Sequence, residues 1–122
     1  MPEMLPHATI NLIATRCHLA LQAMSNSSGT SSTARTLLEV TIATSVLAEL
    51  GYGAVSEVTA RDAEDAVRRS VESGLATGRW HLDEVGAHAI CRIVEVFEAQ
   101  LASAPASDVE AAFTTVKKLG VG

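Results

Sequence analysis

The longest apolar pattern in the chain covers residues 32–50, and wound as a helix it has no polar face. Its larger apolar residues point in opposite directions: Leu37, Val40 and Leu47 to one side, Ile42 and Val46 to the other. A helix that is apolar all round is a buried helix, so something must cover it on every side. Gly51 follows at the position where a left-handed residue commonly closes a helix.

Residues 39–46 within this stretch also fit a β-strand. Val40, Ile42 and Val46 share one parity, polar residues occupy the other, and many of the residues are β-branched. We favour the helix because the segment continues without a break to Leu50 and because Gly51 suits a helix end. The strand stays open as the alternative.

Shorter apolar stripes predict four more helices around the central one. Their ranges are about 8–24, from between 54 and 59 to 77, from 84 to about 104, and from 107 to 119. We expect Gly78 to cap the end of the third helix along the chain and Asp83 to cap the start of the fourth. Ser107 and Glu110 form a capping-box pattern that predicts the start of the last helix, and Gly120 ends it.

Two segments have no helical period. Residues 1–7 hold two prolines and predict an extended lead-in, and residues 25–33 predict a flexible Ser/Thr-rich loop whose last Ser or Thr caps the central helix. This loop lacks the preceding strand and the Gly-Lys-Ser/Thr ending of a phosphate-binding loop. Residues 1–122 are therefore expected to form a single all-α domain, a compact bundle of about five helices around the helix 32–50.

The composition supports close helix packing and argues against nucleic-acid binding and membrane insertion. Hydrophobic residues make up 48% of the chain but aromatic residues only 3%, so the helices must approach one another through small side chains. A net charge of −5 argues against direct nucleic-acid binding, which needs a basic surface. No stretch reaches the roughly 20 apolar residues of a membrane span, and no signal peptide is evident. We expect a cytoplasmic protein, away from membranes, with its two cysteines reduced.

The third helix along the chain is the most charged. Two pairs, Glu64 with Arg68 and Asp65 with Arg69, have the favourable acid-before-base spacing of four residues and predict ion pairs. Leu75 closes the modest apolar stripe on its buried side. We therefore interpret its arginines as part of a solvated, ion-paired face.

The strongest candidates for metal or redox chemistry are His88 and Cys91, three residues apart on one helix. With Glu84 and Glu95 they form a ladder of possible ligands, which we place opposite an apolar side that includes Val85. A solvated face explains the same pattern. Cys17 and His18 point about 100° apart on their helix and are not expected to join them. We expect no metal, no cofactor and no catalytic residue, because no thiol has a base, an orienting group and an oxyanion hole at recognisable spacing.

Several short motifs resemble those of a loose group of small, uncharacterised helical proteins from proteobacteria. They are Glu-Leu-Gly-Tyr-Gly at 49–53, Thr-Gly-Arg-Trp at 77–80 followed by Leu-Asp at 82–83, and Gln-Leu at 100–101. The resemblance covers about residues 10–105. It implies a compact bacterial helical domain carried on mobile elements, and it implies no activity and no functional residue.

The remaining signals concern partner contacts. The connector places Trp80 between Arg79 and His81, and Tyr52 lies in a Gly-Tyr-Gly turn; Trp, Tyr and Arg are enriched at binding hot spots. Alternatively, Trp80 closes the end of the bundle and Tyr52 covers a helix terminus. On the first helix, Leu12 and Leu19 lie outside the main apolar stripe and widen its apolar surface.

These observations predict a non-enzymatic helical interaction module. The surplus of apolar surface on the first two helices suggests a homodimer through Leu12 and Leu19, or a different protein partner. The alternative is a small regulator or sensor that binds a metal or ligand through the face of His88 and Cys91. A third hypothesis is an acidic protein that blocks or mimics a nucleic-acid site.

Overall fold

The computed structural model describes residues 3–119, and within that range the chain forms five α-helices. Their bounds are α1 His7–Ser25, α2 Ser31–Glu49, α3 Glu57–Thr77, α4 Glu84–Ser103 and α5 Ala106–Lys118. The predicted all-α bundle is confirmed. The expected end of the last helix at Gly120 lies outside the described residues.

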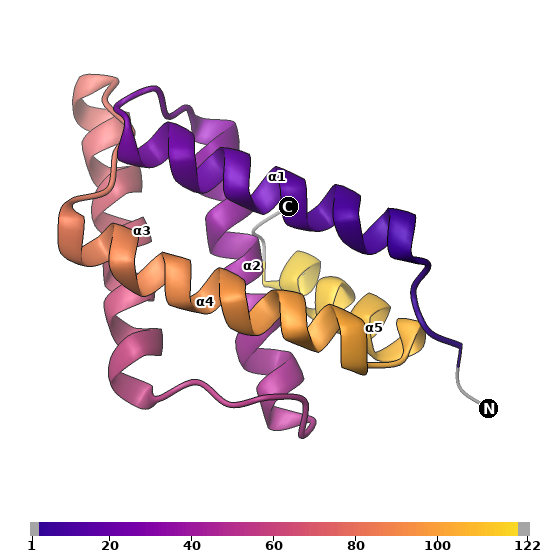
Figure 1. The fold of residues 1–122 in the computed structure, drawn as a ribbon. Coiled ribbons are helices and arrows are strands. Elements are labelled where there is room, and N and C mark those ends of the chain that lie inside the picture. Colours follow the sequence, from indigo (N-terminus) through magenta and orange to yellow (C-terminus); the bar gives the residue numbers. More distant parts are fainter. Residues whose placement is uncertain (1–2, 120–122) are drawn as a thin grey trace.

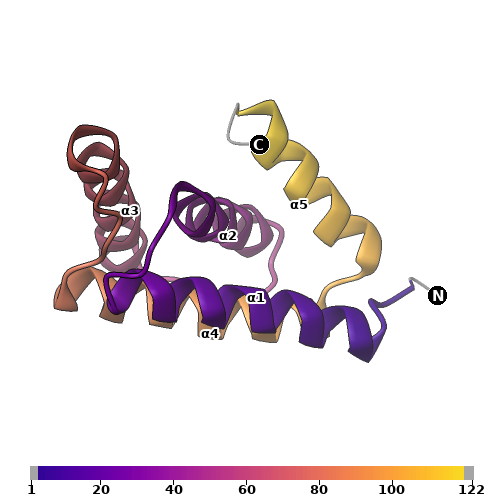
Figure 2. The same cartoon turned by 90° about the horizontal axis from the view of Figure 1, so that it is seen from above.

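The helices form two layers (Figures 1 and 2). Helices α1 and α4 lie side by side in one layer, and α2 lies between α3 and α5 in the other. Helix α2 packs against all four other helices, which confirms its predicted central position. The side of α2 that faces away from α1 and α4 is less well covered, and Leu38 and Ile42 remain half-buried there. The expectation that something covers this helix on every side is therefore met on only part of its surface.

The core lies between the two layers. Its largest fully buried apolar side chains come from all five helices: Met24, Leu37, Leu47, Val67, Ile90, Ile93, Val94, Phe97, Leu101 and Val116. Phe97 meets Phe113 of α5 edge to face, with ring centroids 6.0 Å apart. Small residues of α2, such as Ala34 and Ala43, are also fully buried, and they allow the neighbouring helices to approach closely.

Both ends of α2 are closed by local hydrogen bonds, and its central part is helical, so the strand alternative is wrong. Thr30 and Thr33 form a reciprocal capping box at the start. The cap itself is thus Thr30, and Thr33 at the end of the predicted loop is its partner. At the other end, Gly51 has a φ of 98° and its amide donates to Ala48, while the Tyr52 amide donates to Leu47. This is a Schellman motif, which confirms the predicted role of Gly51.

The predicted capping box at the start of α5 is wrong. Helix α5 begins at Ala106, directly after Pro105, with no side-chain cap. The Ala106 amide instead donates to the Glu3 carbonyl at 2.7 Å, and Met4 forms an isolated antiparallel bridge with Pro105. The lead-in segment therefore supplies an acceptor for the first turn of α5, and Ser107 becomes part of the helix.

Helices α3 and α4 begin and end largely as predicted, with Gly78 in the left-handed conformation and the Asp83 side chain accepting from the Gly86 amide. Their ion pairs differ from the prediction. Arg68 pairs with Asp65 at 2.6 Å and Arg69 with Asp83 at 3.4 Å. Glu64 thus has no ion-pair partner among residues 3–119.

Leu75, Val85 and Leu119, which are predicted on the apolar sides of their helices, are exposed. Leu75, near the end of α3, is 77% exposed, and Val85, in the first turn of α4, is 68% exposed. In the described part of the chain, no helix combines the length and apolar character that a membrane crossing requires.

Candidate functional site

The outer face of α1 carries two exposed leucines. Leu12 is 62% and Leu19 is 59% exposed, and they lie seven residues apart, on the same side of the helix. The residues along this side are all exposed and uncharged: Ala8, Leu12, Thr15, Leu19 and Gln22. We call these five residues the α1 face. Its spacing of alternately four and three residues is typical of a helix–helix contact.

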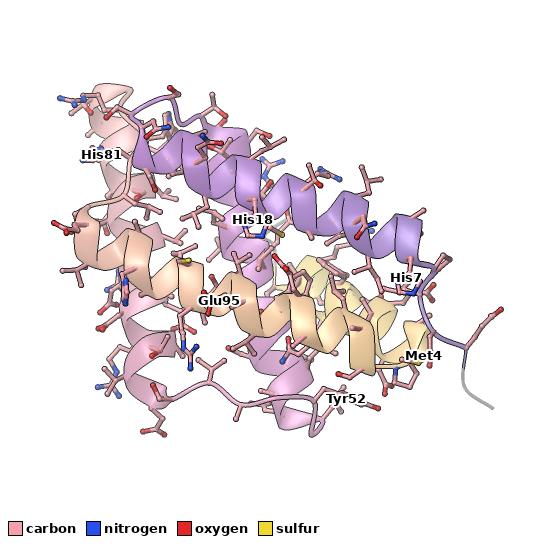
Figure 3. The ribbon with its side chains drawn as sticks, in the orientation of Figure 1. Met4, His7, His18, Tyr52, His81 and Glu95 are labelled. Atoms are coloured by element: carbon pink, nitrogen blue, oxygen red, sulfur yellow. The ribbon has the colours of Figure 1, made fainter. Side chains whose placement is uncertain are left out.

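Charge is nearly absent from α1. The helix has no acidic residue, and Arg16 lies on another side, where it lines a small hollow shared with Glu39 of α2. His18 points toward α4 and bonds to Glu98 (Figure 3). In a protein of net charge −5, two copies can therefore bring their α1 faces together without placing acidic side chains of α1 against each other.

Trp80 closes the end of the bundle where α3 meets the loop between α1 and α2. Its indole ring covers Gly74 so closely that a Cβ at that position would lie 2.1 Å from the ring. Its backbone forms an isolated antiparallel bridge with Gly29. Two residues further on, the Leu82 amide donates to the Met24 carbonyl at 2.9 Å. Trp80 is half-buried against the core, as the alternative interpretation of the connector expected.

The residues on either side of Trp80 differ in exposure. Arg79 is exposed, and it remains available to a partner. His81 is half-buried, its carbonyl accepts from Ser70, and its Nδ1 has no partner among the described residues (Figure 3). The connector is thus mainly a structural element, and the Arg79 guanidinium at its surface makes no ion pair with any of residues 3–119.

Tyr52 joins three parts of the chain. Its hydroxyl donates to Asp108 of α5 at 2.7 Å, and its carbonyl accepts from the buried Gln100 of α4 at 2.6 Å. Gln100 also donates to the Thr44 carbonyl of α2. The hydrogen bond to Asp108 raises the pKa of Tyr52, with smaller contributions from burial and from the negative charge of Asp108. Tyr52 therefore ties the end of α2 to α4 and α5.

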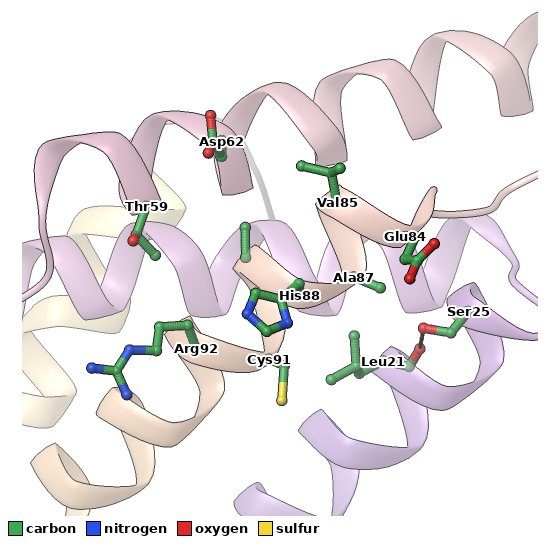
Figure 4. Close-up of a pocket in the computed structure, with 11 residues that line it drawn as sticks. Leu21, Ser25, Thr59, Asp62, Glu84, Val85, Ala87, His88, Cys91 and Arg92 are labelled. Carbon is green, nitrogen blue, oxygen red and sulfur yellow. Dashed lines mark hydrogen bonds between the residues drawn. The ribbon is translucent and has the colours of Figure 1, made fainter.

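A hollow of about 730 Å³ contains His88 and Cys91 (Figure 4). It crosses the outer side of α4 between Leu21 of α1 and Asp62 of α3, and Glu84 and Val85 line it as well. Val85 is thus on the same side as His88, contrary to the prediction, because residues three apart on a helix lie only about 60° apart.

The proposed ladder of metal ligands does not converge. Glu95 lies outside this hollow; it pairs with Arg92 at 3.3 Å, and its other oxygen is 3.9 Å from the Cys91 sulfur. Among residues 3–119 no three His, Cys, Asp or Glu side chains are placed to hold one metal ion. The hollow offers a mixed polar surface to a ligand, but it has no assembled metal site within that range.

Cys17 is separated from this region and is unreactive. It is 2% exposed, and burial, with the negative charge of Glu98, raises its pKa to about 11 even though Arg16 acts in the opposite direction. At neutral pH it is a thiol packed in the core, and a thiol of this kind is a poor nucleophile.

One surface was not identified from the sequence. A groove follows the seam between α2 and α3 on the side away from α1 and α4, and two successive hollows of about 460 and 420 Å³ mark it. Its floor is apolar and its edges carry charges; the lining residues used below are Leu38, Ile42, Val67, Val71, Glu49, Glu57 and Glu64. The apolar character of Ile42, opposite the main buried side of α2, was the sequence signal for it.

Comparisons with protein-family models, with curated proteins and with solved structures find no match for this chain. The resemblance to small helical proteins of proteobacteria thus depends on its short motifs and stays a prediction. Two residues of these motifs have structural roles in this fold. The Trp80 indole covers Gly74 of α3, and the Gln100 side chain donates to the carbonyls of Thr44 and Tyr52.

Proposed function

We propose that this protein is a non-enzymatic interaction module that self-associates through the α1 face. The observation that carries the proposal is the pair Leu12 and Leu19, which are more than half exposed on one uncharged side of a 19-residue helix. Burial of such leucines against each other is favourable by about 1–2 kcal/mol each, because apolar surface leaves water.

An antiparallel pairing of two α1 helices fits this face. A two-fold axis near Thr15 would place Leu12 of one copy against Leu19 of the other, and the reverse contact would follow by symmetry. The contact is self-complementary and small, so we expect a dimer that dissociates on dilution. The non-enzymatic part of the proposal is supported by Cys17, which is a buried thiol of raised pKa.

The test is the mass in solution, measured by size-exclusion chromatography with light scattering over a range of concentrations. We expect the native chain to be a dimer at the upper end of the range and Leu12→Asp and Leu19→Asp to be folded monomers. Leu75→Asp is the matched control, because Leu75 is 77% exposed on α3, and it should stay dimeric. A native chain that is monomeric throughout, or a Leu12→Asp variant that stays dimeric, contradicts the proposal.

A second candidate is a small regulator that binds a ligand in the hollow beside His88 and Cys91. The hollow itself favours it, since at about 730 Å³ it is larger than either hollow of the α2–α3 groove. A stoichiometric metal in protein purified without a tag, or a melting temperature that falls with a chelator, would support the metal-dependent form of this function. Neither result is expected from the self-association module.

A further inference from the structure

Two successive hollows mark the groove between α2 and α3. Leu38, Ile42 and Glu49 lie on one side of α2 at helical spacing, and Glu57, Glu64 and Val71 lie on the facing side of α3. From Leu38 to Glu49 the seam rises about 16 Å, or three turns of helix. A helix of that length can lie along it with its apolar side against the floor.

The floor is already partly covered by the helices that form it. Leu38, Ile42 and Val71 are half-buried, and Val67 below them is fully buried. A third helix would complete the burial of this side of α2, the side that no other described helix covers (Figure 2). Packing of an amphipathic helix into such a groove uses anchors at positions i, i+4 and i+7.

The charges along the groove are unbalanced. Glu49, Glu57 and Glu64 line it and make no ion pair with any residue in the range 3–119. Arg68, the basic residue among the lining side chains, is already paired with Asp65 at 2.6 Å. The side chains that line the groove therefore carry a net negative charge, and Glu57 and Glu64 are spaced one heptad apart.

We propose that this groove binds a basic amphipathic helix from another protein. Its apolar side would lie on Leu38, Ile42 and Val71, and its Lys or Arg residues would face Glu57, Glu64 and Glu49. A second copy of this chain fits less well, because its exposed apolar helix face, on α1, is flanked by one arginine rather than a series of basic residues. The proposal does not depend on self-association through the α1 face.

The test uses a synthetic amphipathic peptide of about 14 residues, long enough to span the seam, with leucines at helical spacing and lysines on its remaining positions. Its binding to the full chain is measured by fluorescence anisotropy at near-physiological salt. A peptide with glutamates in place of the lysines and a scrambled peptide of the same composition are the ligand controls. We expect the basic amphipathic peptide to bind and both controls to bind at least about tenfold more weakly.

Two variants locate the binding. Neutralising the groove (Glu49→Gln, Glu57→Gln, Glu64→Gln) should weaken binding about tenfold, because three favourable charges are lost. The matched control changes the same number of exposed glutamates on other surfaces (Glu3→Gln, Glu84→Gln, Glu110→Gln) and should change binding by less than about twofold. Val71→Lys, with folding checked by circular dichroism, should abolish binding by placing a like charge on the floor.

Several results would overturn the proposal. Equal weakening by the two triple variants would mean that the peptide senses net charge alone. Amide chemical-shift changes confined to α1 or α4 would place the peptide on another surface. A native dimer that Val71→Lys converts to a monomer would mean that a second copy occupies the groove. Failure of the basic peptide to bind also ends the proposal, and that result leaves the Leu12 and Leu19 test unaffected.

Discussion

Trp80 and Leu12 both carry large apolar side chains that the sequence marks as possible partner contacts, and the structure uses them differently. The indole of Trp80 covers Gly74 and closes the space between α3 and the loop after α1. Leu12, with Leu19, projects from α1 into solvent. In a chain with 3% aromatic residues, small side chains leave gaps where helices end, and its single Trp fills one of them.

The largest expected effect is the loss of stability when the Trp80 side chain is removed. Trp80→Ala should lower the free energy of unfolding by about 3 kcal/mol, the lower end of the range for large aromatic residues, because the side chain is half-buried. Leu12→Ala, measured at low protein concentration, should change it by less than about 0.5 kcal/mol. Urea denaturation measures both. Similar losses of unfolding free energy in the two variants would mean that Trp80 does not differ from Leu12 in its contribution to the core.

A substitution at Gly74 sharpens the comparison further. Alanine normally stabilises a helix by about 1 kcal/mol relative to glycine. Here its Cβ meets the indole, so Gly74→Ala should lower the free energy of unfolding by about 1–3 kcal/mol.

The same change in a Trp80→Ala background should become neutral or stabilising, because the obstacle is gone. A double-mutant cycle by urea denaturation gives the coupling between the two positions. If Gly74→Ala stabilises the native chain, the described packing of Trp80 is wrong.

The smallest expected effect concerns Tyr52, the other large side chain in a connector. Its hydrogen bond to Asp108 raises its pKa above the ordinary value of 10.0. Because the folded-state pKa is higher, this bond contributes to stability below pH 10 and the contribution is lost as the pH rises through the raised pKa. The chain holds one tyrosine, so phenolate absorbance reports this titration directly.

We expect the native midpoint to lie above that of Asp108→Asn, and the alkaline loss of stability to be smaller in Tyr52→Phe. Identical midpoints in the native chain and in Asp108→Asn would show that the hydrogen bond does not persist in solution.

Local chemistry made most of the fold predictable. Gly51, Gly78 and Asp83 close helices through bonds to neighbouring residues, so their roles follow from short stretches of sequence. The start of α5 failed this test because its first amide binds the carbonyl of Glu3, which is distant in the sequence. The ion-pair partner of Arg69 was predicted wrongly for a similar reason, since Asp83 lies close to Arg69 only after α3 and α4 have packed.

Candidate surfaces were harder to predict than helices. The exposure of Leu12 and Leu19 agrees with their place outside the main stripe of α1. The α2–α3 groove depends on which sides of two helices remain uncovered, and helical periodicity alone does not decide that. Val85 shows the same limit, because it lies at the edge of the apolar stripe of α4, next to His88, and its side chain is exposed.

The contacts of Glu3 and Met4 with Pro105 and Ala106 have a consequence for the order of folding. They join segments separated by almost the whole length of the chain, and closing so long a loop is entropically unfavourable until the intervening helices have formed. Helix α5 itself packs mainly against α2. We therefore expect this contact to form after α1 to α4 have assembled, and the amide hydrogens of α5 to exchange with solvent through an opening that leaves the rest of the bundle folded.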